Sequence, residues 1–271
     1  MVSCDAGMSP TRGQVIINNR NVSFLRWGGD LRHIVLLHGI TSSARSWWRV
    51  APVLANLGFT VTAFDMPGHG ESGTLPTHEI DAIAAHITAA CSTLDITPHI
   101  MLGHSWGGAV AICATPLLNP VRLILVDPLI ALDVTWAQQA VPRFVEGIGQ
   151  AMHQTTPWLT ARNKLWHRCD IHWKAEALEQ CRREAVDGLF LHSGSWNLVT
   201  ELAALTTPTL CLVAGGDTTV ISAADQAAMG PLIVANGGLL HKIEGTDHNM
   251  HRTGFDQTLP VLLHWIKQGQ V

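Results

Sequence analysis

A serine flanked by glycines lies in the segment GHSWGG at residues 103–108. The residues before it are apolar and typical of a buried strand, and the residues after it have a helical pattern. In this strand–turn–helix setting a tight turn presents the serine hydroxyl at the end of a sheet, where the oxygen can act as a nucleophile. We therefore interpret Ser105 as a candidate catalytic nucleophile. The structural alternative is a glycine-rich turn in which Ser105 only caps the helix.

The elements that must position this serine follow an alternating pattern. Continuous apolar runs bounded by glycine, proline or polar turns are typical of parallel strands buried on both faces, and they occur at 34–39, 60–65, 99–104, 122–127, 209–215 and 239–243. Helical patterns lie between or after them, at 44–57, 80–94, 106–118 and 255–268. The alternation predicts an α/β fold with a mostly parallel, doubly wound sheet, in which ligands bind at the carboxyl ends of the strands.

The alternation stops between residues 128 and 205. This segment has no clear strand pattern, has a helical pattern at 173–191, and contains five of the ten tryptophans, Trp136, Trp158, Trp166, Trp173 and Trp196. An insertion of this length is too long for a plain loop. We predict a helical cap at 128–205 that covers the strand ends, with residues 1–127 and 206–271 forming one core. A chain of 271 residues suits one large domain with such an insertion.

Three segments together resemble the α/β-hydrolase fold family. They are the GHSWGG turn, LLHGITSSARSWW at 36–48, which is similar to the family's oxyanion loop, and DMPGHGES at 65–72, which is similar to its turn after the next strand. The resemblance spans most of the chain outside the cap. It implies that the cap is inserted after the sixth strand and that the catalytic residues follow the order serine, acid, histidine.

The resemblance also implies the general base. A serine hydroxyl needs an imidazole within hydrogen-bond reach to accept its proton. His248, in EGTDHNMHR, follows the last expected strand and precedes the terminal helix, which is the place of the family's histidine. His251 is the alternative base. His241 is less suitable because it lies within a strand pattern, and His104 is interpreted as a packed support.

Two aspartates end neighbouring strand patterns and could orient the imidazole of His248. Asp217 follows TLCLVAGG, and Asp127 ends RLILVD. We expect Asp217 to be the acid, with Asp127 as the alternative, because some members of the family take their acid from the earlier strand. Asp247 is adjacent to His248 in sequence and is poorly placed to reach around to its ring.

Backbone groups should stabilise the negative charge that develops on the substrate. The resemblance implies an oxyanion hole formed by the backbone N–H groups of Ile40, after His38-Gly39, and of Trp106, after the nucleophile. Such donors are already fixed where the charge develops. We interpret His38 and the turn at 65–72 as structural supports of the site.

The nucleophile type narrows the reaction. Related epoxide hydrolases and haloalkane dehalogenases carry an aspartate where this chain has Ser105, and the chain contains no tyrosine to protonate an epoxide oxygen. We expect hydrolysis of a small carboxylic ester or lactone, with an apolar or aromatic group, through an acyl-enzyme. The alternatives are a carbon–carbon bond hydrolase, a prolyl-type aminopeptidase or a perhydrolase, and, from another class, a non-catalytic receptor for a small ligand.

Composition excludes several other classes. The formal net charge of −4 and the low charged fraction of 14% leave no basic field for nucleic acid. No apolar run is long enough to span a membrane, and residues 1–14 lack the apolar segment of a secretory signal. We therefore expect a cytoplasmic monomer or homodimer that acts on a small molecule.

Histidines and cysteines are numerous but do not form metal-ligand patterns. The fifteen histidines lack zinc-site spacing, and the six cysteines contain no C-x-x-C pair. We expect no metal and no cofactor. We also expect the cysteines to be buried free thiols.

Overall fold

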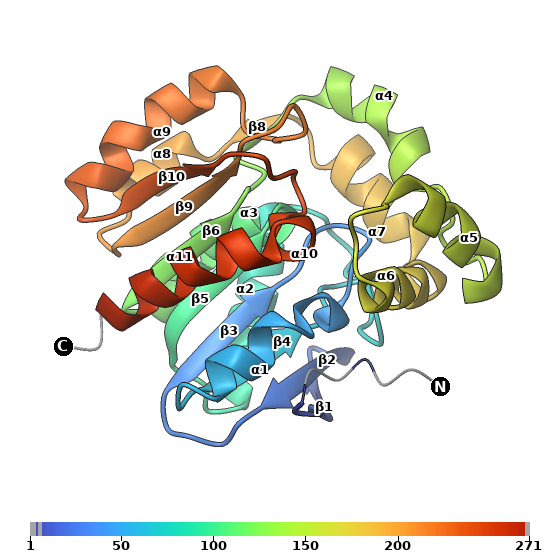
Figure 1. Ribbon diagram of the computed structural model, residues 1–271, viewed down its shortest axis with the longest axis horizontal. Coiled ribbons are helices and arrows are strands. Elements are labelled where there is room, and N and C mark those ends of the chain that lie inside the picture. Colours follow the sequence, from blue (N-terminus) through green and yellow to red (C-terminus); the bar gives the residue numbers. More distant parts are fainter. Residues whose placement is uncertain (1–3, 5–6, 269–271) are drawn as a thin grey trace.

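The computed structural model describes Cys4 and residues 7–268, and its centre is an eight-stranded sheet between two layers of helices (Figure 1). The strand order is β1-β2-β4-β3-β5-β6-β9-β10. Strands β1 and β2 pair antiparallel with their neighbours and the others pair parallel. The prediction of a mostly parallel, doubly wound α/β sheet is confirmed. The expectation for residues 1–14 concerns in part residues 1–3, 5 and 6, which lie outside the described residues.

The strands of the sheet are β1 (Thr11–Ile17), β2 (Arg20–Trp27), β3 (His33–Leu37), β4 (Thr60–Phe64), β5 (Pro98–His104), β6 (Arg122–Val126), β9 (Thr209–Ala214) and β10 (Leu239–Ile243). The six apolar runs of the sequence correspond to β3, β4, β5, β6, β9 and β10. The sequence analysis missed the β1–β2 hairpin, whose strands are more polar. Its turn residues Asn18 and Asn19 both have positive φ, of 49° and 60°, and a two-residue Asn turn of this kind is the signal that could have revealed it.

Helices cover both faces of the sheet because neighbouring residues of each buried strand point to opposite sides. Val35 and Leu37 pack in the layer that contains α2 and α3, whereas Ile34 and Leu36 pack against α1 and α11. The helices of the core are η1 (Ala44–Trp47, 3₁₀), α1 (Val50–Ala55), α2 (Ile80–Thr93), α3 (Trp106–Leu118), α9 (Ala223–Ala235), α10 (Met250–Thr253) and α11 (Phe255–Gln268). The single helix expected at 44–57 is therefore divided into η1 and α1.

The segment between β6 and β9 is mainly helical, and its helices α4 to α7 lie together to one side of the sheet (Figure 1). Its elements are β7 (Ala131–Leu132), α4 (Val134–Phe144), α5 (Met152–Arg162), α6 (Arg168–Gln180), α7 (Arg183–Asp187), the π-helical turn η2 (Gly188–His192), β8 (Trp196–Asn197) and α8 (Val199–Ala204). Helices α5 and α6 share a small core of their own. We refer to residues 128–205 as the helical insertion.

Two sequence expectations for the helical insertion need correction. The short strands β7 and β8 pair antiparallel where no strand was expected. The helix expected at 173–191 is interrupted after α6, where Cys181 adopts an extended conformation. There the backbone N–H of Arg182 donates to the carbonyl of Gly68 at 2.8 Å, so a contact with the core replaces a bond of the helix.

A disulfide joins Cys4 to Cys169 at the start of α6, across 165 residues of chain. The expectation of free thiols is wrong for these two residues, because cysteines so far apart in sequence give no local signal of pairing. Cys91, Cys113, Cys181 and Cys211 are free. Trp48 and Trp173 pack against the disulfide, which therefore ties the helical insertion to the core. Separately, no helix in the described part of the chain is long and apolar enough to cross a bilayer.

Replacing Cys4 by serine is expected to lower the free energy of unfolding by about 2–4 kcal/mol, because the unfolded chain loses a long-range constraint. Denaturant unfolding under non-reducing conditions measures the change. Cys113→Ser is the matched control, since Cys113 is a partly exposed free thiol, and it should shift the midpoint little. A wild-type midpoint that does not change on reduction with dithiothreitol would contradict the disulfide.

Candidate functional site

Ser105 lies in a strained turn between β5 and α3. Its φ is 53° and its ψ is −122°, a backbone conformation that costs energy for a residue with a side chain. The backbone N–H of Ser105 donates to Val126 O at 3.1 Å, and its carbonyl accepts from the N–H of Leu129 at 2.9 Å. A Cβ on Gly103 would lie 2.3 Å from the carbonyl oxygen of Gly107, so only glycine permits this close turn. The turn is fixed by β6 on one side and α3 on the other.

His248 and Asp127 form a close hydrogen-bonded pair. Nδ1 of His248 donates to Oδ2 of Asp127 at 2.7 Å. Asp127 is fully buried at the end of β6. With Nδ1 engaged as a donor, Nε2 of a neutral His248 has a lone pair that can accept a proton. This arrangement fixes the tautomer that a general base requires.

The carboxylate of Asp127 is held by more than His248. Its Oδ1 accepts from the backbone N–H of Ala214 at 2.9 Å and from the hydroxyl of Thr219 at 2.7 Å. Its Oδ2 also accepts from the backbone N–H of Val220 at 3.2 Å. Four donors therefore surround a buried carboxylate, which compensates for the loss of water.

The expected pairing of His248 with Asp217 is wrong, and the alternative Asp127 takes that place. Asp217 lies exposed in the turn after β9. Its neighbour Thr218 contributes instead, because its hydroxyl accepts the backbone N–H of His248 at 3.1 Å. Strands β6 and β9 are adjacent and parallel, so both aspartates are near the same edge. Asp127 has a positive φ of 42°, and it is the residue whose carboxylate reaches the ring.

Two further histidines surround His248 and are kept neutral. Nε2 of His104 donates to the carbonyl of His248 at 2.9 Å, as expected for a packed support. The ring of His251 packs 4.5 Å from that of His104, and neither of its nitrogens has a hydrogen-bond partner among the described residues. Burial lowers the pKa of both His104 and His251 well below the usual value. His251 is thus placed behind His104, and His241 lies in β10.

The loop after β3, residues 38–42, lies directly against the nucleophile. A Cβ on Gly39 would be 3.0 Å from Cβ of Ser105. The expected oxyanion donors are therefore positioned on two segments that meet at Ser105: Ile40 follows Gly39, and Trp106 begins α3, where the first N–H groups have no carbonyl partner within the helix. We name residues 38–42 the oxyanion loop.

Neutral histidines hold the oxyanion loop in place. Nε2 of His38 accepts the backbone N–H of Met66 at 2.9 Å, and Nε2 of His69 accepts that of Thr41 at 3.0 Å. Burial lowers the pKa of both imidazoles to about 3. They therefore stay neutral at physiological pH and can accept these bonds.

The turn at 65–72 supports the oxyanion loop as expected. Oδ1 of Asp65 accepts the backbone N–H of Ala44 at 2.8 Å, and its Oδ2 accepts that of Glu71 at 3.2 Å. Arg12 also donates to Oδ2 at 3.2 Å. The Asp65 carboxylate thus connects three segments of backbone beneath the site.

The sequence analysis missed two basic residues that reach the oxyanion loop. Nζ of Lys174, in α6, donates to the carbonyl and the hydroxyl of Thr41 at 2.6 and 2.7 Å. Nη2 of Arg252, in α10, donates to the hydroxyl of Ser42 at 3.0 Å. Desolvation and the nearby Arg252 lower the pKa of Lys174 to about 7. No local sequence signal separates these residues from ordinary surface cations on helices.

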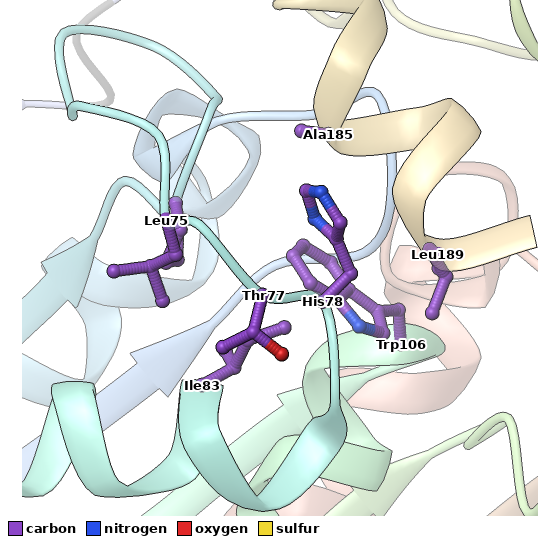
Figure 2. A pocket seen from close by; sticks show the side chains of 8 residues that line it. Leu75, Thr77, His78, Ile83, Trp106, Ala185 and Leu189 are labelled. Carbon is purple, nitrogen blue, oxygen red and sulfur yellow. The ribbon is translucent and has the colours of Figure 1, made fainter. Parts of the chain in front are cut away.

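A small cavity lies beside the nucleophile turn, between the core and the helical insertion. Figure 2 shows Trp106 and His78 on one side and Ala185 and Leu189, from the insertion, on the other. Its volume is about 10 Å³, which is room for a single water. The lining is mostly apolar and consists of Pro67, Leu75, Thr77, His78, Ile83, Trp106, Ala185 and Leu189.

Comparison with known proteins agrees with this geometry. The model of the alpha/beta hydrolase family matches residues 34–259. The N-formylmaleamate deformylase of Pseudomonas putida is 32% identical over 209 residues, which are 75% of this chain and 78% of the relative. 

Two solved structures share the architecture. The structure of E-2-(acetamidomethylene)succinate hydrolase has a TM-score of 0.79 at 20% identity and covers 95% of this chain and 99% of its own. That of the N-formylmaleamic acid deformylase from Pseudomonas putida S16 has a TM-score of 0.77 at 25% identity and covers 93% of this chain and 100% of its own. On the family match and the identity to the deformylase, this chain belongs to the α/β-hydrolase family.

Proposed function

We propose that this hydrolase transfers an acyl group to water through Ser105, with His248 as general base and Asp127 as the orienting acid. The observation that carries the proposal is the 2.7 Å hydrogen bond between His248 and the buried carboxylate of Asp127, beside a serine held in a strained turn. A carboxylate, an imidazole and a serine at one edge of a sheet form the constellation that activates a hydroxyl for acyl transfer.

The proposed reaction has two halves. Nε2 of His248 accepts the proton of the Ser105 hydroxyl as Oγ attacks the substrate carbonyl, and the backbone N–H groups of Ile40 and Trp106 stabilise the oxyanion. The intermediate expels its leaving group, which takes the proton from His248, and an acyl-serine remains. Water then attacks the acyl-serine with His248 again as base, releasing the acid and restoring Ser105.

Neighbouring charges favour this role for His248. It becomes an imidazolium during each half of the reaction, and Asp127 stabilises that positive charge. Burial keeps the pKa of His104 and of His251 far below the usual value, so neither adds a like charge beside it.

For the substrate we propose a small carboxylic ester or lactone with an apolar or aromatic group. The apolar cavity beside Trp106 supports this choice. A second candidate is amide hydrolysis, in particular removal of an N-formyl group, which the identity to the N-formylmaleamate deformylase favours. Both use the same acyl-enzyme. The carbon–carbon hydrolase, aminopeptidase, perhydrolase and receptor alternatives remain distinguishable by turnover.

The helical insertion is proposed to act as a cap over the site, with residues 1–127 and 206–271 as the core. Its contacts support this assignment: Lys174 binds the oxyanion loop, and Ala185 and Leu189 line the cavity beside Trp106. The cytoplasmic location and the monomeric or homodimeric state stay predictions. The Cys4–Cys169 disulfide is an observation against the first, because disulfides persist mainly in oxidising compartments.

Ser105→Ala is expected to lower kcat/KM for a hydrolysed ester by about 10,000-fold or more, because it removes the nucleophile while binding and the oxyanion donors remain. The assay uses p-nitrophenyl esters of increasing acyl length, with N-formylmaleamate alongside them. Circular dichroism checks that the variant is folded. Retention of more than about a tenth of the wild-type activity would exclude Ser105 as the nucleophile.

Asp127→Asn is expected to lower kcat about 1,000- to 10,000-fold, because an amide in its place favours the wrong tautomer of His248. The matched control is Asp217→Asn, an exposed aspartate of the neighbouring strand end, which should change kcat by less than about threefold. Both variants are measured on the same ester. A large loss in Asp217→Asn with a small one in Asp127→Asn would return the acid to Asp217.

A further inference from the structure

Two basic side chains from distant parts of the chain reach adjacent residues of the oxyanion loop. Lys174 comes from the helical insertion and binds Thr41 through Nζ. Arg252 comes from α10, four residues after the general base, and binds the hydroxyl of Ser42. The two are close enough for the charge of Arg252 to lower the pKa of Lys174. Positive charge is thus concentrated at one side of the site.

Neither cation is neutralised by an ion pair among the described residues. The described carboxylates form ion pairs with other groups, and none lies within ion-pair distance of Lys174 or Arg252. Asp170 and Asp247 affect the pKa of Arg252 only from a greater distance. Nε of Arg252 is buried without a hydrogen-bond partner. Desolvated cations without a counter-charge are costly, and a bound anion would remove that cost.

The loop that carries both contacts also touches the nucleophile. Gly39 lies against Ser105, and two residues of chain place the Cα of Thr41 at most about 7 Å from that of Gly39. Lys174 is only half-buried, so a bound molecule can reach it. A group of two or three carbons can span the gap between a carbonyl at Ser105 and a negative charge at these residues.

We propose that Lys174 and Arg252 bind a carboxylate of the substrate, so that the preferred substrates are short esters or amides bearing a carboxylate two or three carbons from the scissile carbonyl. This inference rests on the proposed hydrolysis at Ser105. Lys174 and Arg252 are binding residues in this arrangement, because they contact a part of the substrate that does not react. The competing explanation is structural: Lys174 would only hold Thr41 and thereby position the oxyanion loop.

The first experiment compares two substrates of nearly the same shape. Monoethyl succinate carries a carboxylate, and ethyl succinamate carries a neutral amide in its place. We expect wild-type kcat/KM to be about tenfold or more higher for monoethyl succinate, because a charge-assisted pair replaces a neutral hydrogen bond. Ethanol release measures both rates. Equal rates on the two substrates would overturn the inference.

The second experiment asks whether Lys174 produces this preference. Lys174→Met keeps the length of the side chain and removes its charge, so the ratio of the two kcat/KM values should fall toward one. Lys174→Arg should restore part of it. The matched control is Lys164→Met, which removes an exposed lysine of the same helical insertion and should leave the ratio unchanged. Equal losses on both substrates with an unchanged ratio would assign Lys174 to loop positioning only.

A binding measurement separates this inference from the proposed function. Calorimetry with Ser105→Ala compares the binding of monoethyl succinate and ethyl succinamate without turnover. Tighter binding of the acid that is lost in Ser105→Ala/Lys174→Met supports the carboxylate site even if the wild type hydrolyses neither compound, a result that would contradict only the proposed ester hydrolysis. Equal binding of the two compounds would overturn the carboxylate site.

Discussion

The hydrogen bond between His248 and Asp127 depends on the adjacency of β6 and β9. Asp127 ends β6, and its carboxylate accepts from Ala214 at the end of β9 and from Thr219 and Val220 just beyond it. The same strand end accepts the N–H of Ser105 through Val126 O. Since parallel strands finish at one edge, the sheet brings a serine, a carboxylate and an imidazole together from three distant segments. Any shift of β6 against its neighbours would move all three.

Burial of neutral imidazoles is the second constraint on the site. His38 and His69 accept backbone N–H groups, which a protonated ring could not do. Burial lowers the pKa of each to about 3, so the acceptor form is present throughout the physiological range. The oxyanion loop is therefore held by groups that do not change charge when His248 does, and the dipoles that face the substrate stay fixed through the reaction.

The sequence predicted the parallel strands, α3 and the terminal helix because apolar runs and helical periodicity are local signals. It placed Ser105 and His248 at strand ends for the same reason. It could not choose between Asp127 and Asp217, since both end adjacent strands and the choice depends on how the turn after β9 wraps around the carboxylate. The Cys4–Cys169 disulfide and the contacts of Lys174 and Arg252 join residues more than a hundred positions apart, and no local pattern records such pairs.

Charge is distributed unevenly around the nucleophile. On the side of His248 the acid is buried and fully hydrogen-bonded, and the surrounding histidines are neutral, so the only charge that forms there is the imidazolium. On the side of the oxyanion loop, Lys174 and Arg252 supply positive charge without an ion-paired carboxylate among the described residues. A positive field beside the loop also stabilises negative charge on a reacting carbonyl oxygen. The helical insertion, which supplies Lys174, is therefore part of the electrostatic environment of the site as well as its cover.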